Sequence, residues 1–260
     1  MVKVAAFQIK IASFKDNFKK LEDQCKKLQD QNVDILCLPE KWSQTDVKPE
    51  YISDDSPFLE KISELAKKHN IYIILGALSE KEDDNSFVTS YFFDKNGNLL
   101  GKQRKIHLYS FESKYYARGS EFKIFETEFG KIAITICFDL NAFPEVARAL
   151  ALKGVDLIFN PVMVFESGIE NWHVYLKSRA LENRLPLVGV NGVGKSPMGT
   201  TLTGESLIIK FRKGHESPAK MKFEIGKKSE EEMIISKIDL DYPRQIRKKR
   251  LAEIQDFKIV

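Results

Sequence analysis

The sequence is poor in cysteine and histidine. Its 260 residues include 3 cysteines, Cys25, Cys37 and Cys137, and no CxxC pair. This sparse, odd count argues against a disulfide framework and favours a reducing compartment, so we expect a cytoplasmic protein. The 4 histidines lack a metal-ligand spacing such as HxxxH, and no glycine-rich phosphate loop is visible. We therefore expect no metal site and no cofactor.

Long apolar runs are also missing. No stretch approaches the roughly 18 uncharged apolar residues of a membrane span, and residues 1–9 alternate like a strand rather than a signal sequence. The formal net charge is only +4, and the one concentrated basic cluster runs from Arg244 to Arg250. We interpret that cluster as a solvated C-terminal segment. The expected partner is a small molecule, with neither nucleic acid nor membrane.

What the sequence does contain is an alternation of strands and helices. The pattern predicts helices over 15–30, 56–69, 144–153 and 168–183, a hairpin over 121–136, and strands over 2–9, 33–38, 71–78, 86–93, 101–107, 155–160 and 187–193. Such alternation is typical of a layered α/β fold, and the hairpins imply mixed sheets. With 43% apolar residues, the chain can bury a large core, which favours one domain over residues 1–260.

Cys137 is the first candidate for chemistry. It ends the apolar run 131–136 and precedes a turn and the helix that starts near Pro144. This placement lies at the carboxyl edge of a sheet, where open α/β sheets build their sites, and it predicts a nucleophile. The alternative is a small apolar residue of the core.

Two charged residues follow other predicted strands. Glu40 closes the apolar run 33–38 just after Pro39, and Lys105 ends a basic run that follows a hairpin signal. Either residue alone also fits a solvated loop. Their combination with Cys137 favours a shared site.

In this order, Glu40, Lys105 and Cys137 resemble the Glu-Lys-Cys triad of the nitrilase superfamily of carbon-nitrogen hydrolases. The similarity covers roughly residues 1–210 and is carried by segments 36–42, 104–108, 118–139, 179–183 and 190–191. It implies an amidase-like enzyme with a four-layer αββα sandwich that forms a homodimer or a higher homo-oligomer. Asp139 is typical of the amidase and carbamoylase-like members, whereas true nitrilases tend to have glutamate there.

The residue types also suggest a mechanism. Glu40 is the expected general base for the Cys137 thiol, and the Lys105 ammonium, with the backbone N–H of Phe138, would stabilise an oxyanion. Glu112 lies where the family often has a second glutamate that orients the lysine or the hydrolytic water. The alternative for Glu112 is a surface acid.

Specificity is less well defined by the sequence. Asn141 occupies a place where many family members have an arginine, so the resemblance does not imply specificity for dicarboxylic monoamides. For the substrate-binding residues we expect Phe138, Trp42 and Met163, with Val162 as a further wall residue. Trp42, Val162 and Met163 also fit a core position.

We therefore predict an enzyme that hydrolyses a small linear amide through a Cys137 thioester. Hydrolysis of an N-carbamoyl compound is the alternative within the superfamily. A cysteine enzyme of another class would need a Cys-His pair, for which His107 or His173 would be available. A non-catalytic scaffold is the alternative outside enzymology, but a buried glutamate, lysine and thiol together would be costly without a function.

Overall fold

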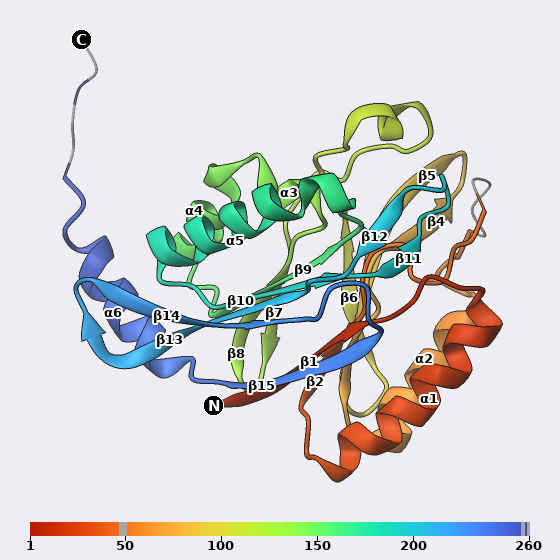
Figure 1. The fold of residues 1–260 in the computed structure, drawn as a ribbon, viewed down its shortest axis with the longest axis horizontal. Helices are drawn as coiled ribbons and strands as arrows, with labels where there is room; N and C mark the ends of the chain where they lie inside the picture. The colour runs from red at the N-terminus through yellow and green to blue at the C-terminus, as the bar shows by residue number, and fades with distance from the viewer. Residues whose placement is uncertain (47–50, 256–257, 259–260) are drawn as a thin grey trace.

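Two β-sheets lie face to face, and helices cover the outer face of each (Figure 1). The computed structural model describes residues 1–46, 51–255 and 258. The arrangement is the expected four-layer αββα sandwich with mixed sheets. Among the described residues, no helix combines the length and the apolar content needed to cross a membrane.

The first sheet contains the N-terminal strands. Its strand order is β15-β1-β2-β3-β5-β4, with β6 paired to β5. The strands are β1 (Val2–Gln8), β2 (Ile35–Cys37), β3 (Tyr72–Ile74), β4 (Leu78–Glu82), β5 (Asn85–Phe93), β6 (Leu99–Arg104) and β15 (Glu232–Ile238). β1, β2 and β3 run parallel, and β15 pairs antiparallel with β1. Helices α1 (Phe14–Asp30) and α2 (Pro57–His69) cover its outer face.

The second sheet has the order β14-β13-β10-β9-β8-β7. Its strands are β7 (Ile124–Thr127), β8 (Gly130–Ile134), β9 (Leu157–Val162), β10 (Leu187–Asn191), β13 (Leu207–Glu216) and β14 (Ala219–Ile225). Helices α3 (Phe138–Asn141), α4 (Pro144–Leu152) and α5 (Ile169–Asn183) lie on this side of the molecule. A separate ribbon pairs β11 (Val193–Lys195) with β12 (Thr201–Thr203), and α6 (Asp241–Leu251) follows β15.

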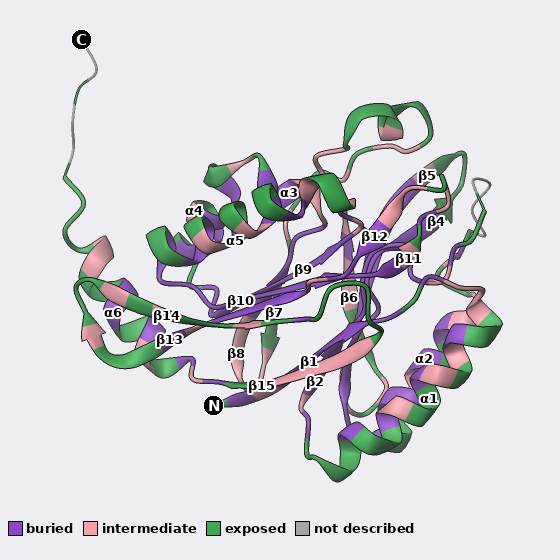
Figure 2. Cartoon of the chain, viewed as in Figure 1, coloured by how far each residue is buried: buried purple, intermediate pink, exposed green. Residues whose placement is uncertain are grey.

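The apolar core explains the layers. In β1, Val4 and Ala6 pack between the two sheets, whereas Ala5 and Phe7 pack under the helices of the first sheet. Because central strands are covered on both faces, they read as nearly continuous apolar runs rather than as an alternation. Figure 2 shows these strands buried and the outer faces of the helices exposed.

Several sequence expectations need correction. Of the expected strand 71–78, only β3 is a strand, and a further strand, β4, begins at residue 78. β6 ends at Arg104, so Lys105 begins the following turn. The chain beyond residue 193 adds strands to both sheets. The basic cluster 244–250 lies in α6 and is not uniformly solvated, because Arg247 is buried with its guanidinium 3.3 Å from Asp156.

Candidate active site

The three predicted triad residues each follow the end of a strand. The backbone N–H of Glu40 donates to the carbonyl of Val162 at 3.2 Å, and the N–H of Cys137 donates to the carbonyl of Pro161 at 2.9 Å. Both residues are thus tied to the carboxyl end of β9. This bond from Glu40 also links the two sheets, so the base and the thiol come from different sheets to one edge of the sandwich.

Lys105 lies between two carboxylates. Its Nζ is 3.0 Å from Oε1 of Glu40 and 2.9 Å from the carboxylate of Glu112. Lys105 and Glu40 are each only 1% exposed. Burial alone would lower the pKa of Lys105, but the charges of Glu40, Cys137 and Glu112 hold that pKa well above its ordinary value. The lysine is therefore a fixed cation.

The carboxylate of Glu112 is positioned by the backbone N–H of Tyr109, just before its own short helix. It lies in a short 3-10 helix, η1 (Ser110–Lys114), and its Oε2 accepts a hydrogen bond from the N–H of Tyr109 at 2.7 Å. The structure thus places Glu112 against Lys105 rather than in solvent.

Cys137 occupies a strained elbow between β8 and α3. Its backbone angles are φ 47° and ψ −106°, an uncommon region for a residue with a side chain. Burial raises the pKa of the Cys137 thiol, and the Glu40 carboxylate adds to the effect, whereas Lys105 opposes it. The resting thiol is therefore protonated, and its activation requires a base. As the first residue of α3, Phe138 has a backbone N–H without an intrahelical acceptor.

Asp139 connects the lysine segment with the cysteine elbow. Its buried carboxylate accepts hydrogen bonds from the backbone N–H groups of Ile106, His107 and Ile136 at 2.7–3.1 Å. Nδ1 of His107 lies 3.0 Å from the same carboxylate, and the His107 ring stacks on Phe143. The exit from β6 and the turn that presents Cys137 are therefore held together.

These groups face a cavity of about 430 Å³. Glu40, Lys105, Glu112 and Cys137 all line it, as do the predicted Phe138 and Met163. Much of the remaining wall is aromatic: Tyr51, Tyr109, Phe111, Tyr115, Tyr116, Phe165, Trp172 and Tyr175. This composition is typical of a small-molecule site with few polar groups.

Two expected wall residues lie elsewhere. Trp42 is fully buried under the first sheet's helices, and its Nε1 donates to the carbonyl of Leu75 at 2.8 Å. Val162 is fully buried among the residues beneath α4 and α5. Neither residue lines the cavity: Val162 lies within β9 and packs under the helices of the second sheet, and Trp42, in the turn after Glu40, packs into the core of the first sheet.

Comparison with known proteins assigns the family. The family model for carbon-nitrogen hydrolases matches residues 3–248. The chain belongs to the carbon-nitrogen hydrolase family. It is accordingly an enzyme that hydrolyses carbon-nitrogen bonds other than peptide bonds.

This carbon-nitrogen hydrolase is similar to several named proteins. It is 34% identical over 207 residues to a probable nitrilase from Schizosaccharomyces pombe, which covers 79% of this chain and 73% of the relative. It is 29% identical to an omega-amidase from Xenopus tropicalis (84% and 80% covered) and 30% identical to a 2-oxoglutaramate amidase from Bacillus subtilis (69% and 71% covered). The crystal structure of Saccharomyces cerevisiae Nit3, a member of the nitrilase superfamily, has the same fold, with a TM-score of 0.84 at 24% identity over 98% of this chain and 96% of that one.

The sequence did not reveal a second buried lysine in the cavity of this carbon-nitrogen hydrolase. Lys41 directly follows Glu40, lines the cavity and is only 7% exposed. Its Nζ donates to Oγ of Ser79 at 2.6 Å and to the hydroxyl of Tyr116 at 2.9 Å. Lys41 has a positive φ of 58°, and a lysine in a turn reads as solvated from sequence alone. Asn141, also flagged by the sequence, lines the cavity too.

No histidine lines the described cavity wall. His107 is bound to Asp139, and Nε2 of His173 lies 2.7 Å from the carbonyl of Glu205. His69 and His215 are also absent from the wall. A Cys-His pair therefore has no support in the geometry.

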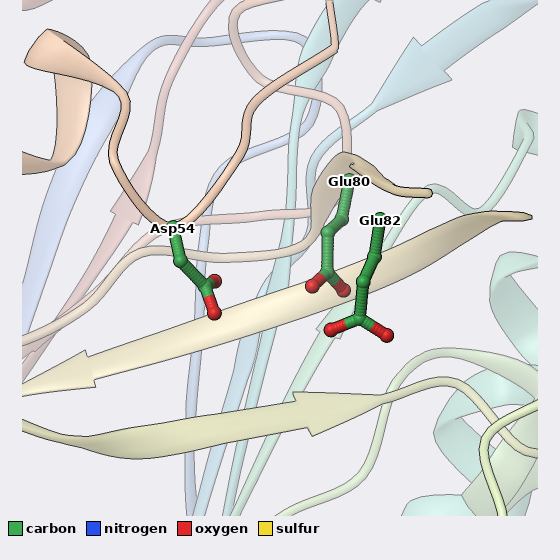
Figure 3. A group of neighbouring side chains, drawn as sticks. All are labelled: Asp54, Glu80 and Glu82. Atoms are coloured by element: carbon green, nitrogen blue, oxygen red, sulfur yellow. The ribbon is translucent and has the colours of Figure 1, made fainter. Parts of the chain in front are cut away.

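The one cluster with metal-ligand character in the described chain lies away from this cavity wall. The carboxylates of Asp54, Glu80 and Glu82 converge to within 4.8 Å of one another (Figure 3). Lys102 contacts Asp54 at 2.7 Å and Glu80 at 2.6 Å, and Arg104 contacts both Glu80 and Glu82. The two cations compensate most of the charge of the three acids and contact each of them, so we interpret the cluster as an ion-pair network that braces β6 against β4.

Proposed function

We propose that the protein hydrolyses a small linear amide by double displacement, with Glu40, Lys105 and Cys137 as the triad and Glu112 as its support. The observation that carries this proposal is the buried Lys105 ammonium held between two carboxylates on the wall of the cavity that contains Cys137. The similarity to an omega-amidase and a 2-oxoglutaramate amidase supports an amide rather than a nitrile substrate.

In the first half of the cycle, Glu40 removes the proton of the Cys137 thiol. The sulfur attacks the amide carbonyl, a C–S bond forms, and the carbonyl oxygen takes the negative charge. Lys105 and the backbone N–H of Phe138 stabilise that oxyanion where water is largely excluded. Collapse of the intermediate breaks the C–N bond, and the proton held by Glu40 passes to the leaving nitrogen. Ammonia or an amine departs and a thioester remains.

In the second half, Glu40 acts as a base toward water. The water oxygen attacks the thioester carbonyl, and the proton it loses goes to Glu40. Collapse then breaks the C–S bond, the acid product leaves, and the thiolate recovers the proton. The contact of Glu112 with Lys105 keeps the ammonium in place through both halves.

Ammonia release tests the proposal. The substrates are a panel of small amides, N-carbamoyl compounds, dipeptides and nitriles, offered to wild type and Cys137→Ala in parallel. We expect turnover of an amide by wild type, no turnover by Cys137→Ala, and a thioester adduct on Cys137 by mass spectrometry. Preference for the N-carbamoyl compounds would favour the alternative within the superfamily. Retained activity in Cys137→Ala would refute the thiol mechanism.

We further propose a cytoplasmic homodimer. The three cysteines are unpaired, which suits a reducing compartment, and α5 exposes the apolar side chains of Val174 and Leu181. Light scattering after size exclusion tests the dimer, and a monomeric mass at micromolar concentration would contradict it.

A further inference from the structure

In the described part of the chain, the second lysine of the cavity has no carboxylate in ion-pair contact. Lys41 is held by two neutral hydroxyls, those of Ser79 and Tyr116, and its Nζ lies 4.5 Å from the centre of the Tyr116 ring. Among the described residues, no carboxylate lies within the 4.0 Å of an ion pair from this Nζ. By contrast, Lys105 in the same cavity has two carboxylates in contact.

This arrangement is electrostatically incomplete. An ammonium group has three N–H donors. For Lys41, the described chain provides acceptors for two of them. A buried charge without an opposite charge in contact is costly, because neutral hydroxyls replace only part of its hydration. The group lies on the wall of a cavity, so a ligand that enters the cavity is able to reach the remaining donor.

We propose that Lys41 is a specificity-determining residue that binds a carboxylate of the substrate. The substrate is accordingly a small amide with a carboxylate on its acyl chain. The inference rests on the function proposed above and names the substrate class for the same site. A single remaining N–H suits one monoanionic carboxylate. A dianionic phosphate would be repelled by Glu40 and Glu112, whose charges act on Lys41.

The position of Lys41 also limits the length of the substrate. Lys41 is the neighbour of the proposed base Glu40, and both line one cavity of about 430 Å³ together with Cys137. The carboxylate and the scissile amide must therefore bind within the same small space. A short acyl chain between them fits this requirement, and the aromatic walls would pack against its methylene groups.

Two amides that differ only in the anionic group test the proposal by turnover. Glutaramate, the monoamide of glutaric acid, carries a carboxylate, and pentanamide has a similar acyl chain without it. In Lys41→Met we expect kcat/KM for glutaramate to fall about 10- to 100-fold, mainly through KM, as for loss of a charge-assisted hydrogen bond. Pentanamide should change little. Lys114→Met, which removes an exposed lysine from η1, is the matched control and should behave as wild type.

A different pattern would overturn the inference. An equal loss for both amides, expressed in kcat, would mean that Lys41 acts on the catalytic groups rather than on the substrate. No loss for either amide would mean that it binds neither. Lys41→Arg keeps the charge and should retain part of the preference for glutaramate, which a merely structural role would not require.

Binding without turnover separates this inference from the proposed mechanism. Calorimetry would measure glutaramate binding to Cys137→Ala and to the double variant Lys41→Met/Cys137→Ala. Tighter binding that depends on Lys41 supports the inference even if wild type fails to hydrolyse the amide, in which case the proposed function fails alone. Equal binding by the two variants, with hydrolysis of neutral amides by wild type, overturns the inference and leaves the proposed function intact.

Discussion

The cavity contains two buried lysines in opposite electrostatic settings. Lys105 touches two carboxylates, and these charges outweigh the effect of burial, so its pKa lies well above the ordinary value. Lys41 touches two hydroxyls, and burial lowers its pKa to about 8 although Glu40 and Glu112 oppose the shift. An ammonium with two counter-ions in contact suits the proposed role of Lys105 as a fixed cation, whereas an ammonium with none in contact among the described residues suits the proposed role of Lys41 in binding a ligand.

The largest expected effect is the loss of Lys105. Lys105→Met should lower kcat for every amide substrate by about 100- to 1,000-fold, since it removes one oxyanion donor. Steady-state ammonia release measures it. The control is Lys102→Met, which removes a lysine of the preceding strand β6 that pairs with Asp54 and Glu80 outside the cavity, and it should leave kcat unchanged. A kcat near wild type for Lys105→Met would remove Lys105 from the mechanism.

The next effect uses pH to separate the two lysines. Above about pH 8, Lys41 loses its proton while Lys105 keeps its own, so KM for glutaramate should rise between pH 8 and 9.5 and KM for pentanamide should not. The titratable groups that act on Lys41 are Glu40, Tyr51, Lys105, Glu112 and its bonded Tyr116. In Lys41→Met the difference between the two substrates should disappear. A rise in both KM values for wild type would assign the titration to another group.

The convergence of the three proposed triad residues at one cavity could be predicted from the sequence for a physical reason. Glu40, Lys105 and Cys137 each follow a run of strand residues, and strand ends of a layered α/β fold meet at one edge. Their types also define one chemistry. The direction in which a side chain points beyond the end of a strand is harder to predict, because the two-residue alternation of the strand stops there. Lys41 and Trp42 lie in such a turn after Pro39, and the sequence does not reveal that the first lines the cavity and the second enters the core.

The C-terminal strands show another limit of the sequence. β15 pairs along its whole length with β1, although the two are at opposite ends of the chain. Local propensity carries no signal for such a distant partner, and β13 and β14 consist of mixed polar and apolar residues on the edge of the second sheet. By contrast, the central strands, buried on both faces, were recognisable from composition alone.

The two lysines should also differ in what they do to stability. The lowered pKa of Lys41 means that charging it in the folded protein costs about 3 kcal/mol, present in full below pH 8 and lost as pH rises toward the unfolded value near 10.5. Lys41→Met removes this cost and gives up two hydrogen bonds of about 1 kcal/mol each. Ser79 and Tyr116 still bond each other at 2.8 Å. We expect Tm to rise by about 2–4 °C at pH 7.

Calorimetric melting as a function of pH checks this stability prediction. The gain for Lys41→Met should vanish at about pH 9, where the remaining charging cost of about 2 kcal/mol equals the two lost hydrogen bonds, and it should become a loss at higher pH. Lys105→Met should instead lower Tm, because it removes the cation in contact with the buried Glu40 and the partly buried Glu112 carboxylates, a loss of about 3–5 kcal/mol. If both variants are destabilised equally at pH 7, the electrostatic contrast between the two lysines is wrong.

The smallest expected effect concerns the hydroxyl that holds Lys41. Tyr116→Phe keeps the ring beside the ammonium but removes one acceptor, so Lys41 keeps its charge and loses part of its orientation. Because Ser79 still holds the ammonium, we expect a loss of about 1 kcal/mol, less than the full strength of a charge-assisted hydrogen bond, which corresponds to roughly a fivefold rise in KM for glutaramate with kcat unchanged. Tyr115→Phe, which alters a more exposed tyrosine of the cavity wall, is the control. A fall in kcat with Tyr116→Phe would instead tie the Lys41 network to the triad, and the two lysines would then act as one unit.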